Sequence, residues 1–190
     1  MMKHSLIILL LALLVSPRVS SASALMQQPQ FPAEEYSVYD AVIDQMFPSG
    51  RVSFDFGGQK ILKPLVIRSK TYDESSLNGD NYPGVDEETF NDFVSKRKAV
   101  WTLVSARFST LVPHIVVDFD DRERMKTMAE TIEANGYATF SRVGFDANRT
   151  HAFVSMSYSC GGLCGHGFAV SLMKTDGHWK VQKVNQLWIS

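Results

Sequence analysis

The segment SCGGLCGHG at residues 159–167 constrains this chain more than any other stretch. It holds both cysteines of the chain, Cys160 and Cys164, and four of its twelve glycines. On each side of it, apolar and small polar residues alternate with the period of a β-strand that buries one face. Glycines supply the backbone freedom that a tight connection between two strands requires. The segment therefore predicts the turn of a β-hairpin.

The hairpin register follows from placing Cys160 opposite Cys164 across a three-residue loop. Counting outward from that pair sets apolar residues opposite one another along one face of the two strands. A slip of one residue would turn half of them toward water, so the pattern favours this single register. The predicted pairs are Tyr158 with His166, Met156 with Phe168, Val154 with Val170 and Ala152 with Leu172.

Facing cysteines at a hairpin end lie near the Cα separation of a disulfide, and we predict a structural bond between Cys160 and Cys164. Two other interpretations stay open. A thioredoxin-type redox pair needs two intervening residues and a helix, whereas three residues, including two glycines, separate these cysteines. A zinc site could use Cys160, Cys164 and His166, with His178 as the nearest further ligand in sequence. We expect no metal and no cofactor.

The first 24 residues have the pattern of a secretory signal peptide. Lys3 and His4 give a positive start, residues 6–15 are apolar without interruption, and the sequence ASA at residues 22–24 fits a cleavage site. An apolar run of this length is too short to span a bilayer. We therefore expect a secreted or periplasmic protein, cleaved near Ala24, in a compartment where disulfides form.

The remaining length predicts a short disordered leader at residues 25–31 and a single α+β domain at residues 32–190. Removing residues 1–24 leaves 17 of the 19 basic residues against 20 acidic ones. This balance gives no electrostatic reason to bind nucleic acid or an anionic membrane. No later run is long and apolar enough to predict a membrane span. The partner is expected to be a small molecule or a protein, and the sequence leaves the oligomeric state open.

Three helices are predicted before the C-terminal strands. The first begins at Pro32 and ends before Pro48. The second is capped by Asp86 and carries an apolar stripe from Phe90 to Trp101 and Val104. The third has Met125, Met128, Ala129 and Ile132 on one face and ends at Asn135-Gly136. Residues 52–56 and 61–67 predict a hairpin whose second strand Pro64 confines to a sheet edge.

From residue 137 onward the chain alternates as strands do. Residues 137–145 predict one strand, a loop at 147–150 returns the chain, and Asp176-Gly177 is a strong hairpin signal. The last segment has no polar tail, so the chain should end within the sheet. The expected architecture is N-terminal helices packed on one face of a four-stranded C-terminal antiparallel meander.

Several C-terminal motifs carry a resemblance to a known group of proteins. In order, they are VGFD at 143–146, CGGLCG at 160–165, DGHWKV at 176–181 and WIS at 188–190. Together they resemble uncharacterised exported bacterial proteins that end in the same sheet, and this resemblance implies no activity. The helix-then-sheet order also resembles the cystatin-like and NTF2-like α+β folds, which host both binding proteins and enzymes.

The sequence contains no motif that carries a reaction. Ser157 and His151 share a strand face but lie roughly 20 Å apart. The nucleophile elbow and the phosphate-binding loop are both missing their defining residues. We therefore expect an exported non-catalytic module of unknown role, which binds a ligand or serves the cell envelope. The alternative is a small secreted hydrolase or thiol-redox enzyme that uses Cys160, Cys164 and His166.

His166 and Tyr158 are the candidate binding residues, because they end the apolar ladder beside the cysteines. Both side chains offer a hydrogen-bond donor and an acceptor, as orienting groups in ligand pockets do. One interpretation places them on the rim of a pocket between sheet and helices. The other is a partly exposed histidine that caps the sheet and bonds to the tyrosine.

Overall fold

A computed structural model of the protein describes residues 32–48, 64–77, 82–160 and 164–190. The signal peptide and leader predicted at residues 1–31 lie outside these ranges, as does the first strand of the hairpin predicted at 52–56. The described residues belong to one compact unit of the chain. Within them, no helix is long and apolar enough to cross a bilayer.

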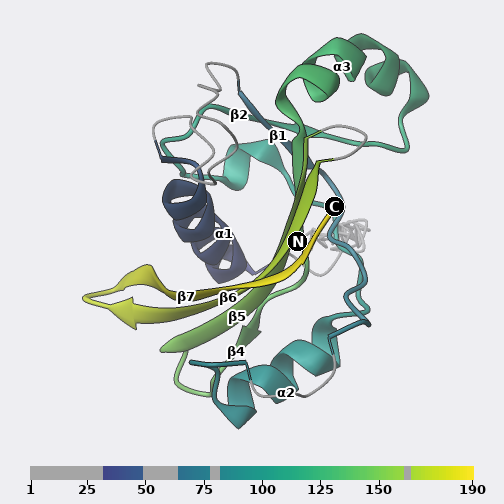
Figure 1. Ribbon diagram of the computed structural model, residues 1–190. Helices are drawn as coiled ribbons and strands as arrows, with labels where there is room; N and C mark the ends of the chain where they lie inside the picture. The colour runs from purple at the N-terminus through teal and green to yellow at the C-terminus, as the bar shows by residue number, and fades with distance from the viewer. Residues whose placement is uncertain (1–31, 49–63, 78–81, 161–163) are drawn as a thin grey trace, which may run out of the picture. The chain divides into compact units, whose positions relative to one another are not determined.

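The described residues form a mixed α+β structure with a seven-stranded, mostly antiparallel sheet (Figure 1). Its strand order is β2-β1-β3-β5-β6-β7, and β4 pairs with β5 beside this path. The helices are α1 (Ala33–Met46), α2 (Glu87–Lys96) and α3 (Arg122–Asn135). The strands are β1 (Leu65–Arg68), β2 (His114–Val117), β3 (Tyr137–Phe140), β4 (Gly144–Phe145), β5 (His151–Ser159), β6 (Gly165–Thr175) and β7 (His178–Ile189).

The antiparallel meander predicted for the C-terminal third is present in the predicted register. Strands β5 and β6 pair Tyr158 with His166, and their ladder continues to Ala152 opposite Leu172. The two neighbouring turns also set the expected partners, Phe145 opposite Ala152 and Leu172 opposite Val181. One buried face and short turns were sufficient to fix this register.

The sheet is larger than the predicted meander. Strands β1 and β2 extend it on the far side of β3, and β1 runs parallel to both β2 and β3. The edge position expected from Pro64 is therefore wrong, because β1 is an inner strand. Pro64 lies just before the strand, where its missing N–H removes no ladder hydrogen bond.

Two predicted elements differ from the sequence pattern, one in length and one in continuity. Helix α2 ends at Lys96. Trp101 lies beyond it in an extended segment, and the backbone N–H of Trp101 donates to the Thr71 hydroxyl at 2.8 Å. The strand predicted at 137–145 is divided into β3 and β4. Between them lies Arg142, which turns inward to a buried carboxylate, that of Glu35.

Glu35 and Arg142 form an ion pair inside the protein. Nη2 of Arg142 donates to Oε1 of Glu35 at 2.7 Å, and Nε donates to Oε2 at 3.0 Å. The Val143 N–H also donates to Oε2 at 3.1 Å. The guanidinium lies 4.4 Å from the centre of the Trp101 ring. This pair connects the first turn of α1 to the interruption between β3 and β4.

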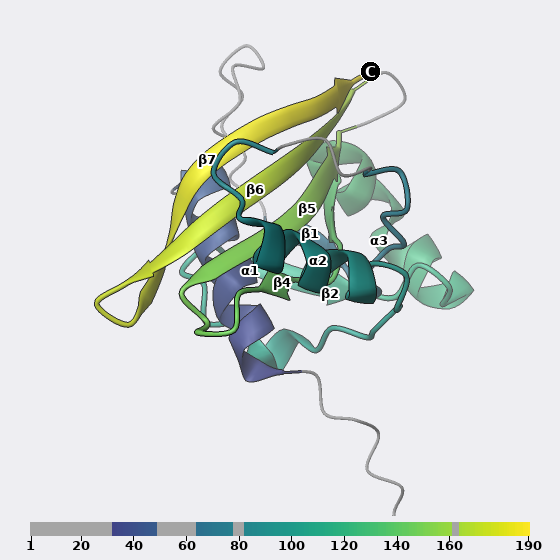
Figure 2. The same cartoon turned by 90° about the horizontal axis from the view of Figure 1, so that it is seen from below.

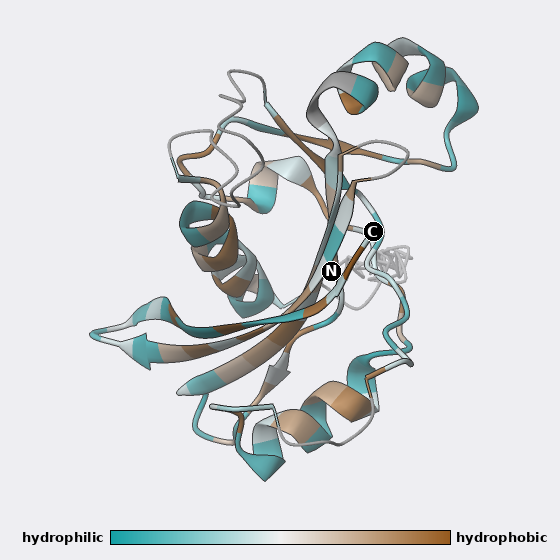
Figure 3. Ribbon diagram, in the orientation of Figure 1, coloured by the Kyte–Doolittle hydropathy of each residue, from teal (hydrophilic) through white to brown (hydrophobic). Residues whose placement is uncertain are grey.

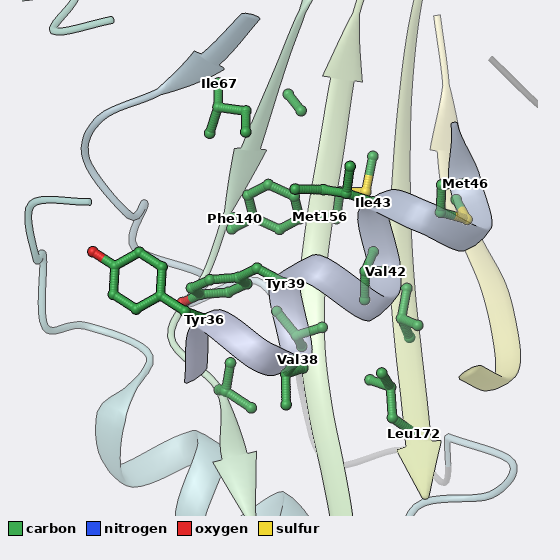
Figure 4. Close-up of a cluster of buried hydrophobic side chains, with 14 of the residues drawn as sticks. Tyr36, Val38, Tyr39, Val42, Ile43, Met46, Ile67, Phe140, Met156 and Leu172 are labelled. Atoms are coloured by element: carbon green, nitrogen blue, oxygen red, sulfur yellow. The ribbon is translucent and has the colours of Figure 1, made fainter. Parts of the chain in front are cut away.

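The helices cover both faces of the sheet, whereas the sequence pattern indicated one. Helix α1 packs on the face that carries Ala152, Val154 and Met156, and its labelled side chains point toward the strands (Figure 4). The hydropathy colouring shows hydrophobic residues on the side of α1 that faces the sheet (Figure 3). Helix α2 packs on the opposite face, where its Phe93 contacts Phe153 with ring centres 4.9 Å apart. Figures 1 and 2 show the two helices on opposite sides of β5 to β7. We call the face opposite α1 the second face.

Helix α3 is capped at both ends, and it ends at the residues that the sequence predicts. The Asp121 carboxylate accepts from the Arg124 N–H at 3.0 Å, and Gly136 ends the helix with a φ of 68°. A side chain at Gly136 would meet the backbone of Ser159 and Cys160, so the end of α3 contacts the start of the cysteine loop.

Candidate functional site

Cys160 and Cys164 form a disulfide at the end of the β5–β6 hairpin, with Cα atoms 5.0 Å apart. The Cys160 N–H donates to the Cys164 carbonyl at 2.8 Å. Within the described residues, no group of three His, Cys, Asp or Glu side chains is arranged to hold a metal ion. The cysteines therefore stand in the arrangement expected of a structural disulfide.

His166 and Tyr158 are cross-strand partners, as predicted, but both are buried, with exposed fractions of 5% and 2%. The His166 ring stacks parallel to that of Phe168, with centres 6.0 Å apart. Burial lowers the pKa of His166 and raises the pKa of Tyr158 to about 12. The expectation of a partly exposed histidine is wrong, because Phe168 lies against one side of the ring and the Gln186 side chain of β7 places its Nε2 3.5 Å from Nδ1 of His166.

A shallow acidic groove lies between the start of α2 and the loop from β4 to β5. It is lined by Gly84, Val85, Asp86, Glu88, Asp146 and His151. Two of its carboxylates hold local structure. Asp86 caps α2 by accepting from the Thr89 N–H at 2.8 Å. Asp146 closes the loop by accepting from the Thr150 N–H at 2.7 Å and the His151 N–H at 2.8 Å.

Trp188 on β7 stands out on the second face. It pairs with Gly167 of β6, and a Cβ at Gly167 would lie only 2.0 Å from the indole Nε1. A Cβ at Gly165 would lie 3.0 Å from the same ring. The indole therefore rests on two glycines, while 46% of the residue remains exposed. The result is a fixed aromatic surface that solvent can reach.

Hydroxyl groups continue the row that begins at Trp188. Gly167 pairs with Ser157 of β5, and Ser157 pairs with Thr139 of β3. The hydroxyls of Thr139 and Ser157 are 2.5 Å apart. In the next row along the strands, Ser159 pairs with Tyr137, and both are partly exposed.

A second hydroxyl network adjoins this row at Ser155. The Ser155 hydroxyl lies 2.6 Å from the Tyr72 hydroxyl and donates to the Glu74 carboxylate at 3.0 Å. Burial, and then the nearby Glu74 charge, raise the pKa of Tyr72 far above its ordinary value. This carboxylate is buried and accepts from the Ser155 hydroxyl.

At the other end of the row stands Arg68, on β1. Its guanidinium lies 5.6 Å from the centre of the Phe119 ring, and that ring contacts Tyr137 at 4.7 Å. The β1–β3 register, continued by one residue, places Arg68 beside Thr139. We call the set of Trp188, Ser157, Ser159, Tyr137 and Arg68 the Trp188 surface.

From the sequence, Trp188 is predicted only as part of the last segment of the sheet and of the C-terminal WIS motif. The sequence does contain a signal for such an aromatic surface. Two glycines at alternate strand positions leave room on one face for a large side chain from a neighbouring strand, and they are Gly165 and Gly167. What the sequence could not supply was the β6–β7 register. A one-residue shift at Leu187, between Gln186 and Trp188, sets which side chain lies on the glycines.

Comparisons with models of protein families, with curated proteins and with solved structures found no match to this chain.

Proposed function

We propose that this protein is an exported, non-catalytic binding module that takes a carbohydrate chain on the Trp188 surface. The observation that carries the proposal is the exposed indole of Trp188, held flat on Gly165 and Gly167 in one row with hydroxyl side chains. A sugar ring has an apolar C–H face, which packs on an aromatic ring, and peripheral hydroxyls, which exchange hydrogen bonds with Ser and Tyr. A ring that is already fixed loses little conformational freedom on binding.

Export is part of the proposal. The signal-peptide pattern at residues 1–24 and the disulfide between Cys160 and Cys164 both support a secreted or periplasmic location. The C-terminal motifs place the chain, in this proposal, with the exported bacterial proteins that they resemble. Packing of α1 along one face of an antiparallel meander supports the likeness to cystatin-like and NTF2-like folds.

We do not favour the enzyme alternative at Cys160, Cys164 and His166. The two cysteines are bonded to each other, and the His166 ring is buried against Phe168. Tyr158 and His166 are both buried, so a ligand could reach them only if the side chains around them moved. The Trp188 surface needs no such movement.

The proposal is tested with Trp188→Ala against soluble tetrasaccharides of plant and bacterial cell-wall polysaccharides. Affinity is measured by calorimetry and by the change in tryptophan fluorescence. Because the indole supplies the stacking surface, we expect Trp188→Ala to weaken binding at least roughly tenfold. Ile189→Ala is the matched control, since Ile189 is the adjacent residue and is 67% exposed.

Two outcomes would overturn the proposal. One is that no oligosaccharide of the panel binds the purified protein. The other is that Trp188→Ala and Ile189→Ala bind as the wild type does. A Trp188-dependent affinity for a proline-rich peptide alone would assign the surface to a protein partner instead. Gly167→Ala provides a second variant, because its Cβ displaces the indole without removing it.

A further inference from the structure

The charge on the Trp188 surface lies at one end. Arg68 stands on β1 and Trp188 on β7, with β3, β5 and β6 between them. Since neighbouring strands lie about 4.8 Å apart, the row from Arg68 to Trp188 spans roughly 19 Å. A short oligosaccharide covers such a distance, and a single sugar does not.

Arg68 retains its capacity to bind an anion. Among the described residues, no carboxylate lies within ion-pair distance of its guanidinium. The nearby acids Asp118 and Asp120 both form ion pairs with Lys70. Nζ of Lys70 lies 3.9 Å from Oδ1 of Asp118 and closer still to Oδ2 of Asp120. The Phe119 ring beneath the guanidinium supports its plane. A planar, supported guanidinium is suited to bidentate hydrogen bonds with a carboxylate.

We infer that the preferred ligand is an acidic oligosaccharide, whose sugar ring stacks on Trp188 and whose carboxylate is received by Arg68 at the other end of the row. This inference rests on the proposed function and specifies its ligand class. The Glu74 carboxylate adjoins the row at Ser155 on β5, two strands away from Arg68 on β1. Glu74 is buried and its carboxylate accepts from the Ser155 hydroxyl.

The experiment compares tetragalacturonate with its fully methyl-esterified form, which has the same length and no charge. We expect the wild type to bind the acid roughly tenfold tighter than the ester, as a charge-assisted bidentate contact allows. Arg68→Gln should weaken binding of the acid more than binding of the ester, and so remove this preference. Arg68→Lys should keep part of the preference, because lysine retains the positive charge but cannot donate two parallel hydrogen bonds to a carboxylate.

Lys183→Gln is the matched control. Lys183 is an exposed basic residue that pairs with Ser171 on the same face but lies outside the row. Its loss should leave the preference for the acid intact. Melting temperatures of all variants show whether each is folded.

The outcomes separate the inference from the proposed function. If acid and ester bind equally, or if Arg68→Gln weakens both alike, the inference is overturned, and Trp188-dependent binding of the ester still supports the proposed function. Equal loss of preference in Lys183→Gln and Arg68→Gln also contradicts it, because the effect would then be one of net charge. If neither oligosaccharide binds, the inference and the proposed function both fail.

Discussion

At the scale of single residues, the pair formed by Glu35 and Arg142 is the strongest buried electrostatic feature of the described structure. Both side chains are almost wholly removed from water, at exposed fractions of 0% and 5%. Burying the two charges is costly, and the bidentate contact together with the Val143 N–H offsets that cost. The pair therefore acts less as a source of net stability than as a constraint on where α1 meets the sheet.

Glu35→Gln should destabilise the protein by about 3–5 kcal/mol, because it leaves the buried Arg142 charge without its partner. The free energy of unfolding is measured by urea denaturation. Glu34→Gln is the control, because Glu34 forms a more exposed pair with Lys174 at 2.7 Å. That change should cost less than about 1 kcal/mol. Equal losses in the two variants would contradict the importance of burial.

Asp146 gives the protein a pH dependence in acid. Burial acts to raise its pKa, but hydrogen bonds from His151 and Thr150 prevail and lower the pKa to about 2. Because this lies below the pKa of an unfolded aspartate, about 3.9, ionised Asp146 stabilises the fold above about pH 4. That contribution is lost as the pH falls through 2.

Asp146→Asn should therefore lower the free energy of unfolding by about 2 kcal/mol at neutral pH. The difference from the wild type should shrink as the pH falls from about 4 toward 2. Unfolding by urea is followed at several pH values for both proteins. A constant difference across this range would show that Asp146 does not carry the acid sensitivity.

At the scale of elements, the meander could be predicted from the sequence and the parallel strands could not. Strands β5 and β6 are buried on both faces, but large apolar residues fill one face and mostly small residues the other, so their alternation revealed both the strands and their register. In β1 all but Arg68 are buried, so no alternation marks its two faces. Its partners β2 and β3 lie far apart in sequence, and parallel pairing leaves no turn signal. Nothing local therefore indicated that the first half of the chain joins the sheet.

The same reasoning applies to the candidate site. His166 and Tyr158 could be paired from the sequence, but their burial depends on side chains from distant parts of the chain, Phe47 beside Tyr158 and Gln186 beside His166. Arg68 and Trp188 are 120 positions apart in the sequence, and only the completed sheet brings them into one row. The glycines below Trp188 were visible, whereas the register that places the indole on them was not.

The cysteine loop is an element whose contribution to stability can be measured. Replacing Cys160 and Cys164 together by Ser should lower the free energy of unfolding by about 2 kcal/mol, the chain-entropy value for so short a loop. Mass spectrometry of exported protein, with and without reductant, should differ by two hydrogens. Two free thiols in that material, or unchanged stability of the double variant, would argue against a structural role.

At the scale of the whole molecule, the described strands of the sheet end at β2 on one side and at β7 on the other, and these two strands differ in length. Strand β2 has four residues, and β7 has twelve. A long unpaired edge can pair with a second chain, and proteins oppose this with bulges and lysines. Strand β7 has both, because its register shifts by one residue at Gln182 and at Leu187, and because Lys180 and Lys183 are exposed.

Replacing Lys180 and Lys183 together by Val should increase self-association, because the change removes two charges and raises β-propensity on an edge that already exposes Val184 and Ile189. Sedimentation velocity at matched concentrations should show more of the larger species than the wild type does. The control replaces Lys98 and Lys126 by Val, an identical change of composition away from any strand. If both double variants sediment alike, hydrophobicity alone explains the result. If neither differs from the wild type, the two bulges are sufficient to protect the edge without the lysines.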